Sequence, residues 1–359
     1  MTLNPSRILV VGPAWVGDMV MAHCLFRMLK SRREDLTITL TAPPVTAQIA
    51  HRMAEIDEII ETPFRHGRLH LADRFRIGAA LRNRKFDQAI VLPGSIKAAL
   101  LPFFAKVPVR TGYRGEPRWG LVNDSRDRPA SREDPMAARF VQLGLSADAP
   151  PVSHYPYPRL ATHPNVAAEI LHRLGRKLGP SPVIAICPGA EYGSAKRWPE
   201  RHFATLADHY LNQGWQIWLL GGDGDRQTAQ TIMKNVCEPD RCVNLAGLTR
   251  IDEAIDLLAY ANAAVSNDSG LMHIAAASGT PVVGIFGASS ERHTPPLGDL
   301  TSAVSQQLSC RPCFSRQCPL EHKNCLETLN PDLVIQSLSS LLAKLPREPD
   351  DIIGFDHSG

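Results

Sequence analysis

The alternation of short apolar runs with helical patterns is the feature that most limits what this chain can fold into. In the first half, predicted strands and helices follow one another at Ile8–Val11, Asp18–Lys30, Thr37–Leu40, Pro44–Met53, Glu58–Ile60, Leu69–Arg84, Gln88–Leu92 and Ser95–Phe104. Largely apolar runs of this length are typical of strands that are buried on both faces. A repeated strand–helix order predicts a parallel sheet that is covered by helices on both sides.

The same alternation returns in the second half, after a proline-rich segment. Its predicted elements are Val183–Cys187, Pro199–Asn212, Gln216–Leu220, Arg226–Val236, Asp252–Ala261, Ala263–Val265, Val282–Phe286 and Pro331–Lys344. The prolines between the halves exclude a helix there, so we interpret that segment as a linker. A length of 359 residues also suggests about two domains.

We therefore predict an α/β chain with two Rossmann-like, doubly wound domains that face a central cleft. The predicted parts are a first domain at 1–150, a linker at 151–165, a second domain at 166–330, a helix at 331–345 and a flexible tail at 346–359. We expect the helix to pack back on the first domain. In such folds, ligands bind at the carboxyl ends of the strands, which here border the cleft.

Composition excludes several classes of protein. Hydrophobic residues make up 44% of the chain and charged residues 21%, as in ordinary globular proteins. No run of about 18 apolar residues exists, so no membrane-spanning helix is expected. The first residues lead directly into a predicted strand and lack the apolar region of a signal peptide, which favours a cytoplasmic protein.

Charge is divided unevenly between the halves. Residues 1–160 carry a net charge of +8 and residues 161–359 one of −5, so the first half is expected to meet an anionic partner. Much of the excess lies in 65–85, where a solvated helix face is an equally good interpretation. Nucleic acid is disfavoured, because this segment lacks interleaved aromatic residues and aromatic content is only 6%.

The segment 263–277 predicts an anion-binding site. A buried strand leads through a polar turn into a helix of small residues that starts near Ser269. The free N–H groups and the dipole at a helix start favour negative charge. Asp268 precedes this helix and His273 lies in its first turn. We expect the diphosphate of a nucleotide here.

A glycine-containing loop, Gly12–Met19, follows the first strand. Its glycine spacing resembles that of a phosphate-binding P-loop, but Asp18 and Met19 stand where that loop needs Lys and Ser or Thr. The dinucleotide pattern G-x-G-x-x-G is also absent. Asp18 is then either an N-cap of the following helix or a general base that faces the cleft.

Further charged loops follow other strands. Lys196, in the loop 188–199, is either a phosphate-binding lysine or a surface lysine. The pair Asp223 and Asp225 resembles a metal-binding Asp-x-Asp, but its place before a helix favours N-capping. The segments 95–97 and 110–116 supply cations to the cleft or simply to the solvent.

Four of the eight cysteines form a cluster: Cys310, Cys313, Cys318 and Cys325. Four thiolates suit a structural zinc ion, with His322 as a substitute ligand. A cysteine-rich surface loop without metal is the alternative, because the spacing is irregular. The other cysteines are interpreted as small core residues.

Taken together, these segments resemble the ADP-heptose:lipopolysaccharide heptosyltransferases of glycosyltransferase family 9, along nearly the whole chain. The resemblance is carried by residues 12–19, 91–97, 110–116, 188–199 and 267–273. It implies a GT-B fold and inverting transfer of heptose from ADP-heptose to the first heptose of the lipopolysaccharide inner core (Hep-Kdo2-lipid A). It also implies chemistry without a cofactor or catalytic metal, at the cytoplasmic face of the inner membrane.

The resemblance further assigns roles to individual residues. It implies that Asp18 is the catalytic base. The implied donor-binding residues are Lys196, Asp268, Ser269, Gly270, His273, Gly189, Glu191, Tyr192, Gly222, Thr249 and Met272. The implied acceptor-binding residues are Gly17, Trp15, Ser95, Lys97, Arg114 and Glu116.

Two alternatives stay open at this point, and so does the oligomeric state. One is a glycosyltransferase of the same fold with another donor or core position. The other is a non-catalytic protein that binds anionic lipid or nucleotide. An oxidoreductase is disfavoured, because the dinucleotide pattern is missing.

Overall fold

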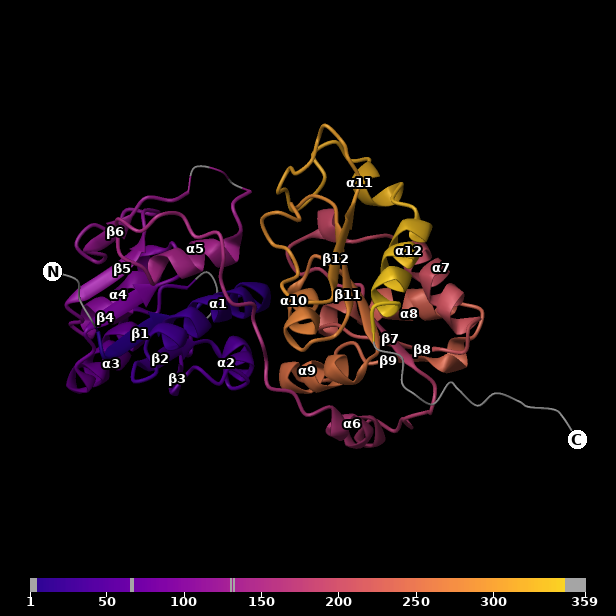
Figure 1. Cartoon of the computed structure of the whole chain (residues 1–359), viewed down its shortest axis with the longest axis horizontal. Helices are drawn as coiled ribbons and strands as arrows, with labels where there is room; N and C mark the ends of the chain where they lie inside the picture. The colour runs from indigo at the N-terminus through magenta and orange to yellow at the C-terminus, as the bar shows by residue number, and fades with distance from the viewer. Residues whose placement is uncertain (1–4, 65–67, 130, 132, 346–359) are drawn as a thin grey trace, which may run out of the picture.

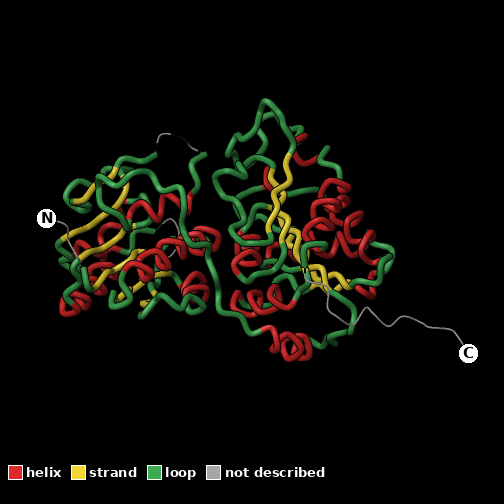
Figure 2. Tube along the Cα trace, in the orientation of Figure 1, coloured by secondary structure: helices red, strands yellow, loops and turns green. Residues whose placement is uncertain are grey.

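Two parallel six-stranded sheets, each with its own helices, form the protein (Figures 1 and 2). The computed structural model describes residues 5–64, 68–129, 131 and 133–345. The predicted tail at 346–359 and the start of the basic segment at Arg65 lie outside the described residues. The α/β class with two doubly wound sheets is as predicted.

The first sheet has the strand order β3-β2-β1-β4-β5-β6, with every pair parallel. Its strands are β1 (Arg7–Val11), β2 (Thr37–Ala42), β3 (Glu58–Glu61), β4 (Gln88–Val91), β5 (Val109–Tyr113) and β6 (Asp124–Arg126). Its helices are α1 (Val16–Arg32), α2 (Pro44–Ala50), α3 (Leu71–Leu81), α4 (Ile96–Phe104) and α5 (Met136–Leu143). The strand order reverses beside β1, which places the loop after β1 at a ligand-binding position.

The second sheet has the order β12-β11-β10-β7-β8-β9, again with every pair parallel. Its strands are β7 (Val183–Cys187), β8 (Gln216–Leu219), β9 (Cys242–Asn244), β10 (Ala263–Asn267), β11 (Val282–Phe286) and β12 (Thr301–Ser305). The helices are α6 (Ala167–Arg173), α7 (Glu200–Leu211), α8 (Arg226–Lys234), α9 (Ile251–Tyr260), α10 (Gly270–Ala277), α11 (Asn324–Glu327) and α12 (Pro331–Leu342). In the described residues, no helix has both the length and the apolar character that a membrane span requires.

The last helix corrects one expectation. Helix α12 does not pack back on the first domain; it lies against α7 and against strands β11 and β12 of the second sheet. Val334, Leu338 and Leu341 supply the buried face of α12. Those three apolar positions recur at helical spacing, so their burial was predictable, but the surface that covers them was not.

The two halves are joined by a continuous apolar core. Helix α1 is buried around most of its circumference and packs against both α5 and α10, so it lies between the two sheets. The proline-rich segment runs alongside without helix or strand, and Leu160 donates its N–H to the carbonyl of Ala277. Arg52 adds two hydrogen bonds to the carboxylate of Asp256 at 2.7 and 3.0 Å. These contacts hold the two halves of the chain together.

Candidate functional site

Asp18 lies in the first turn of α1, directly after the loop that follows β1. The N-cap of α1 is Trp15, not Asp18, so the N-cap interpretation of Asp18 is wrong. Burial raises the pKa of the Asp18 carboxyl to about 6, although the positive charge of Lys196 lowers it; the negative charge of Asp268 raises it further. A carboxylate with a pKa near neutrality is well suited to accept a proton at physiological pH.

Across from Asp18, the second sheet presents the start of α10 and a buried ion pair. The Lys196 ammonium lies 2.5 Å from the Asp268 carboxylate, whose side chain is only 4% exposed. The other oxygen of Asp268 accepts a hydrogen bond from Thr294 at 3.3 Å. Ser269 is the N-cap residue of α10, and its hydroxyl lies 3.1 Å from that of Ser266. This arrangement provides a cation and a helix dipole for an anion.

The starts of α1 and α10 approach so closely that only glycine fits between them. A Cβ atom on Gly270 would lie 2.5 Å from Cγ1 of Val16, and one on Gly17 would lie 2.8 Å from Cδ2 of His273. His273 is buried, and burial lowers its pKa to about 4, so its ring is neutral at physiological pH. The positive charge at this point therefore comes from Lys196 and the helix dipole, not from His273.

The loop that carries Lys196 is fixed by strand β10. Asn267 donates a hydrogen bond to the carbonyl of Pro188 at 2.6 Å and accepts one from the N–H of Trp198 at 3.1 Å. Tyr192 donates its hydroxyl to the carbonyl of Phe314 at 3.0 Å, and its ring lies 5.1 Å from the Lys196 ammonium. The loop thus holds Lys196 in place before any ligand binds.

Three adjoining cavities meet at this point. The central cavity, of about 320 Å³, contains both Asp18 and Lys196 in its wall. A nucleotide-side cavity of about 550 Å³ shares Val16, Glu191, Ser269 and Gly270 with it. A first-domain cavity of about 570 Å³ shares Trp15, Asp18 and Met136 with it. Asp18 therefore borders the compartments of both domains.

The structure brings together most of the residues that the resemblance implies. The central cavity is lined by Trp15, Gly17, Tyr192, Lys196, Asp268, Ser269, Gly270 and His273, the nucleotide-side cavity by Gly189, Glu191, Gly222 and Thr249, and the first-domain cavity by Ser95, Lys97 and Glu116. Glu116 also accepts a hydrogen bond from the N–H of Ile96 at 2.8 Å. Its carboxylate therefore caps α4.

Two implied residues are not placed at the site. The Met272 side chain is fully buried with its sulfur against Gly284 of β11, and it lines none of the three cavities, so a role of Met272 in donor binding stays a prediction. Arg114 is exposed and paired with Asp127 at 2.6 Å, and it lines none of the three cavities. Asp225 occupies the N-cap position of α8 without a side-chain cap bond; its carboxylate instead accepts the N–H of Gly222, as the third residue of the short 3-10 helix 223–225.

The sequence analysis missed three arginines that line the first-domain cavity: Arg74, Arg128 and Arg139. Within the described chain none of them forms an ion pair, and the Nε atom of Arg139 is buried without a partner. Burial lowers the pKa of Arg74 to about 10 and also lowers that of Arg139. The net charge of the first half was the available signal, but it could not say which arginines face the cavity.

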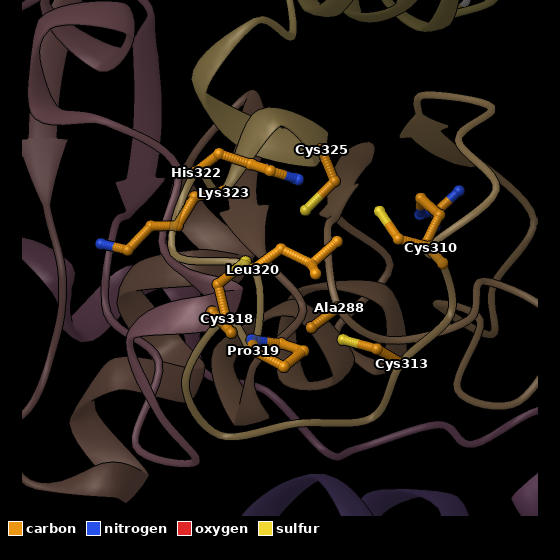
Figure 3. A pocket seen from close by; sticks show the side chains of 11 residues that line it. Ala288, Cys310, Cys313, Cys318, Pro319, Leu320, His322, Lys323 and Cys325 are labelled. Atoms are coloured by element: carbon orange, nitrogen blue, oxygen red, sulfur yellow. The ribbon is translucent and has the colours of Figure 1, made fainter.

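The cysteine cluster lies beside the site and lines a small cavity of about 20 Å³ (Figure 3). In the described part of the chain, no three His, Cys, Asp or Glu side chains are positioned as ligands of one metal ion. The structural zinc therefore stays a prediction, for which elemental analysis of the purified protein is the measurement. The backbone of this segment does contact the donor loop, because Ala195 donates its N–H to the carbonyl of Arg316.

A carboxylate that faces a lysine and a helix start across a cleft between two Rossmann-like domains suits a glycosyltransferase of the GT-B fold. Comparison with known proteins identifies the family. The model of glycosyltransferase family 9 (heptosyltransferase) matches residues 74–324. The chain belongs to this family, and it is a glycosyltransferase.

Relatives and solved structures support this assignment along nearly the whole chain. The chain is 39% identical to lipooligosaccharide heptosyltransferase 2 of Haemophilus influenzae, covering 94% of this chain and 100% of the relative. It is 36% identical to lipopolysaccharide heptosyltransferase 2 of Escherichia coli K12, covering 94% and 98%. The solved structure of E. coli ADP-heptose lps heptosyltransferase II superposes with a TM-score of 0.82 at 34% identity, covering 94% of this chain and 98% of that one.

Proposed function

We propose that this enzyme transfers heptose from ADP-heptose to the first heptose of the lipopolysaccharide inner core, Hep-Kdo2-lipid A, with inversion at the anomeric carbon. The observation that carries this proposal is the position of Asp18. Its carboxylate borders the first-domain cavity and also faces Lys196 and the start of α10 across the central cavity.

The proposed reaction is a single displacement. A hydroxyl oxygen of the acceptor attacks the anomeric carbon of the donor while the bond from that carbon to the diphosphate oxygen breaks. Asp18 accepts the hydroxyl proton, and the leaving ADP keeps the electron pair. Lys196 and the N–H groups at the start of α10 stabilise the charge that develops on the diphosphate. No step requires a metal ion, because these groups already supply positive charge.

The donor is assigned to the nucleotide-side cavity. Its wall contains the backbone of Gly189 and Gly222, and a Cβ on Gly189 would lie 2.2 Å from the Asp225 carboxylate. Ser269 and Gly270 connect this cavity to the central one, so a diphosphate placed there lies at the helix start. Adenine and heptose as the two ends of the donor are supported by the E. coli relative, whose name contains ADP-heptose.

The acceptor is assigned to the first-domain cavity. In the wall of this cavity Arg74 is buried, Arg139 is half-buried and Arg128 is exposed, and none of the three has a carboxylate partner in the described chain. Buried cations without partners are costly unless an anionic ligand compensates them. Kdo carboxylates and lipid A phosphates are such anions. Because that acceptor is a lipid, we also place the enzyme at the cytoplasmic face of the inner membrane.

The test is ADP release from ADP-heptose in the presence of Hep-Kdo2-lipid A. We expect Asp18→Asn to lower kcat by about 10²–10⁴-fold, the usual contribution of a general base. Asp35→Asn, on an exposed carboxylate that pairs with Arg33, is the matched control and should leave kcat unchanged.

The outcomes separate the alternatives. A loss of less than a few-fold in Asp18→Asn would remove Asp18 from the role of base. Faster release from ADP-glucose or a UDP-sugar would assign another donor. No ADP release with any donor, despite tight nucleotide binding, would indicate a non-catalytic binding protein.

A further inference from the structure

An exposed apolar and cationic surface lies on the first domain, outside the three cavities. Its apolar members are Leu69, Leu71, Phe75, Phe103 and Trp119, with exposed fractions of 51, 50, 51, 43 and 90%. Leu71 and Phe75 lie on α3, and Leu69 lies just before it. Phe103 lies on α4, and Trp119 lies in the loop between β5 and β6. Single exposed apolar residues are ordinary on protein surfaces, but a contiguous group marks an interaction surface.

Contacts connect the members of this group that lie on α3 and α4. Leu71 and Phe75 are one helical turn apart on α3. The ring of Phe75 lies 5.3 Å from that of Phe104, and the ring of Phe104 lies 5.8 Å from that of Phe103. Helices α3 and α4 meet at Gly78, where a Cβ would lie 2.6 Å from Cβ of Phe104. The helices therefore present these rings side by side.

Arg110 connects the aromatic group to the loop that carries Trp119. Its guanidinium lies 5.6 Å from the centre of the Phe103 ring and donates a hydrogen bond to the carbonyl of Gly120 at 2.9 Å. The same group donates to the carbonyl of Leu121 at 2.7 Å. The position of the loop is thus fixed, so Trp119 is held in the solvent by the fold.

Exposed cations lie on the same segments of the chain as the apolar group. The exposed ones are Arg68, Arg76, Arg82, Lys85 and Lys106. Arg82 also lies 5.8 Å from the centre of the Phe75 ring and donates to the carbonyl of Phe104. The acid on α3 is Asp73, which pairs with Arg76 at 3.1 Å and lies 3.4 Å from the His70 ring. The surface therefore has an excess of positive charge.

We propose that α3, α4 and the loop 114–123 form the surface through which the enzyme docks on an anionic phospholipid bilayer. Trp and Phe favour the headgroup region, and each Lys or Arg near an anionic leaflet adds attraction. An acidic protein would also suit the charge, but a contiguous apolar centre ringed by long cationic side chains matches the layering of a bilayer interface.

The surface also adjoins the acceptor compartment. Arg74, which lines the first-domain cavity, lies on α3 with its guanidinium 3.7 Å from the centre of the Phe64 ring, and it donates to the carbonyl of Leu69 at 2.8 Å. Lys97, in the first turn of α4, lines the same cavity. A lipid anchored in the bilayer would then present its sugar to this cavity. This last step rests on the proposed function; the docking itself does not.

The first experiment measures binding of the full chain to vesicles by sedimentation and by tryptophan fluorescence. The vesicles contain phosphatidylcholine alone or with one third phosphatidylglycerol. We expect strong binding to the anionic vesicles only, and a blue shift of the emission. Trp119→Phe should keep the binding and lose most of the blue shift, because Trp119 is the most exposed of the five tryptophans, at 90% against 37% for Trp15.

Variants then locate the surface. The double variant Arg76→Glu/Lys106→Glu should bind the anionic vesicles at least about tenfold more weakly, since each charge near the leaflet contributes on the order of 1 kcal/mol. Phe103→Ser should weaken vesicle binding both at low salt and at high salt. Lys234→Glu and Leu333→Ser, on exposed faces of α8 and α12, are the matched controls and should bind as the wild type does.

The result that would overturn the proposal is wild-type binding that is equal for both kinds of vesicle, or that is unaffected by the double variant. An activity assay separates this outcome from failure of the proposed function. The surface variants should lose transfer to acceptor in vesicles and keep transfer to a delipidated core oligosaccharide. Absence of transfer to either acceptor by the wild type would refute the proposed function, while the vesicle measurement would still decide the docking surface.

Discussion

At the scale of single residues, burial decides which charges are available for chemistry. The carboxyl of Asp18 and the ring of His273 are both desolvated, and each is pushed toward its neutral form. For Asp18 this raises the pKa to about 6, which makes it a better base. For His273, burial lowers the pKa to about 4, so the ring carries no positive charge at physiological pH.

The pH dependence of the reaction follows from the Asp18 pKa. Asp18 must be ionised to accept a proton, so kcat should fall about tenfold per pH unit below pH 6 and level off above it. The measurement is kcat at saturating substrates between acidic and slightly alkaline pH. The residual rate of Asp18→Asn should lack this inflection. An inflection near 3.8, the ordinary value, would contradict the burial of Asp18 in the working enzyme.

The ion pair of Lys196 and Asp268 should serve catalysis and stability at once. Lys196→Met leaves the Asp268 carboxylate buried without a cationic partner, so we expect a loss of about 3 kcal/mol in the free energy of unfolding. We also expect kcat to fall by about 10²–10³-fold, because a charge that stabilises the leaving group is gone.

A second variant separates these two roles. Lys196→Met/Asp268→Asn removes both charges and should recover most of the lost stability, as measured by chemical denaturation. Its kcat should stay as low as that of Lys196→Met. If activity returned together with stability, Lys196 would be only a structural residue.

At the scale of elements, the approach of α1 to α10 forms the site. Each helix follows a buried parallel strand, so each start lies at the carboxyl edge of its sheet. The sequence predicted both helices and both edges, since the apolar runs and glycines are local signals. It missed β5, β6, β9 and β12, because these short strands are partly exposed and lack a continuous apolar run.

The close packing of these helix starts gives a direct test. Gly270→Ala places a methyl group 2.5 Å from Val16, whose branched side chain is fixed to the start of α1. The helices must then separate, so kcat/KM should fall at least about tenfold, with about 1–3 kcal/mol of stability lost. Ala168→Val, on the exposed face of α6, adds more volume at a surface site and should change neither. Wild-type kcat/KM in Gly270→Ala would show that the helices need not approach this closely.

At the scale of the whole molecule, the two halves of the chain differ both in net charge and in the cavity that each contains. The half with a net charge of +8 contains the first-domain cavity and its arginines, and the half with −5 contains the nucleotide-side cavity. In the proposed function, the donor half binds its anion through Lys196 and the dipole of α10, and Arg197 and Arg250 also line the nucleotide-side cavity. The acceptor half relies on several cations and on long-range attraction.

This division predicts unequal responses to salt. Added salt should raise the KM for the anionic acceptor more steeply than the KM for ADP-heptose, because exposed charges are screened more than buried ones. The check is to measure both KM values across a series of ionic strengths at constant pH. Equal slopes for the two substrates would contradict the assignment of the acceptor to the basic half.

The sequence by itself determined the two parallel sheets, the start of α10 near Ser269 and the presence of a carboxylate after the first strand. These features depend on local apolar runs, on glycine and on helix starts, which neighbouring residues specify. Only the tertiary structure decided that Asp18 is buried opposite Lys196, that α12 covers the second sheet and that Arg74, Arg128 and Arg139 share one cavity. Those properties depend on residues far apart in the chain, because burial and electrostatic coupling arise only when the two domains pack together.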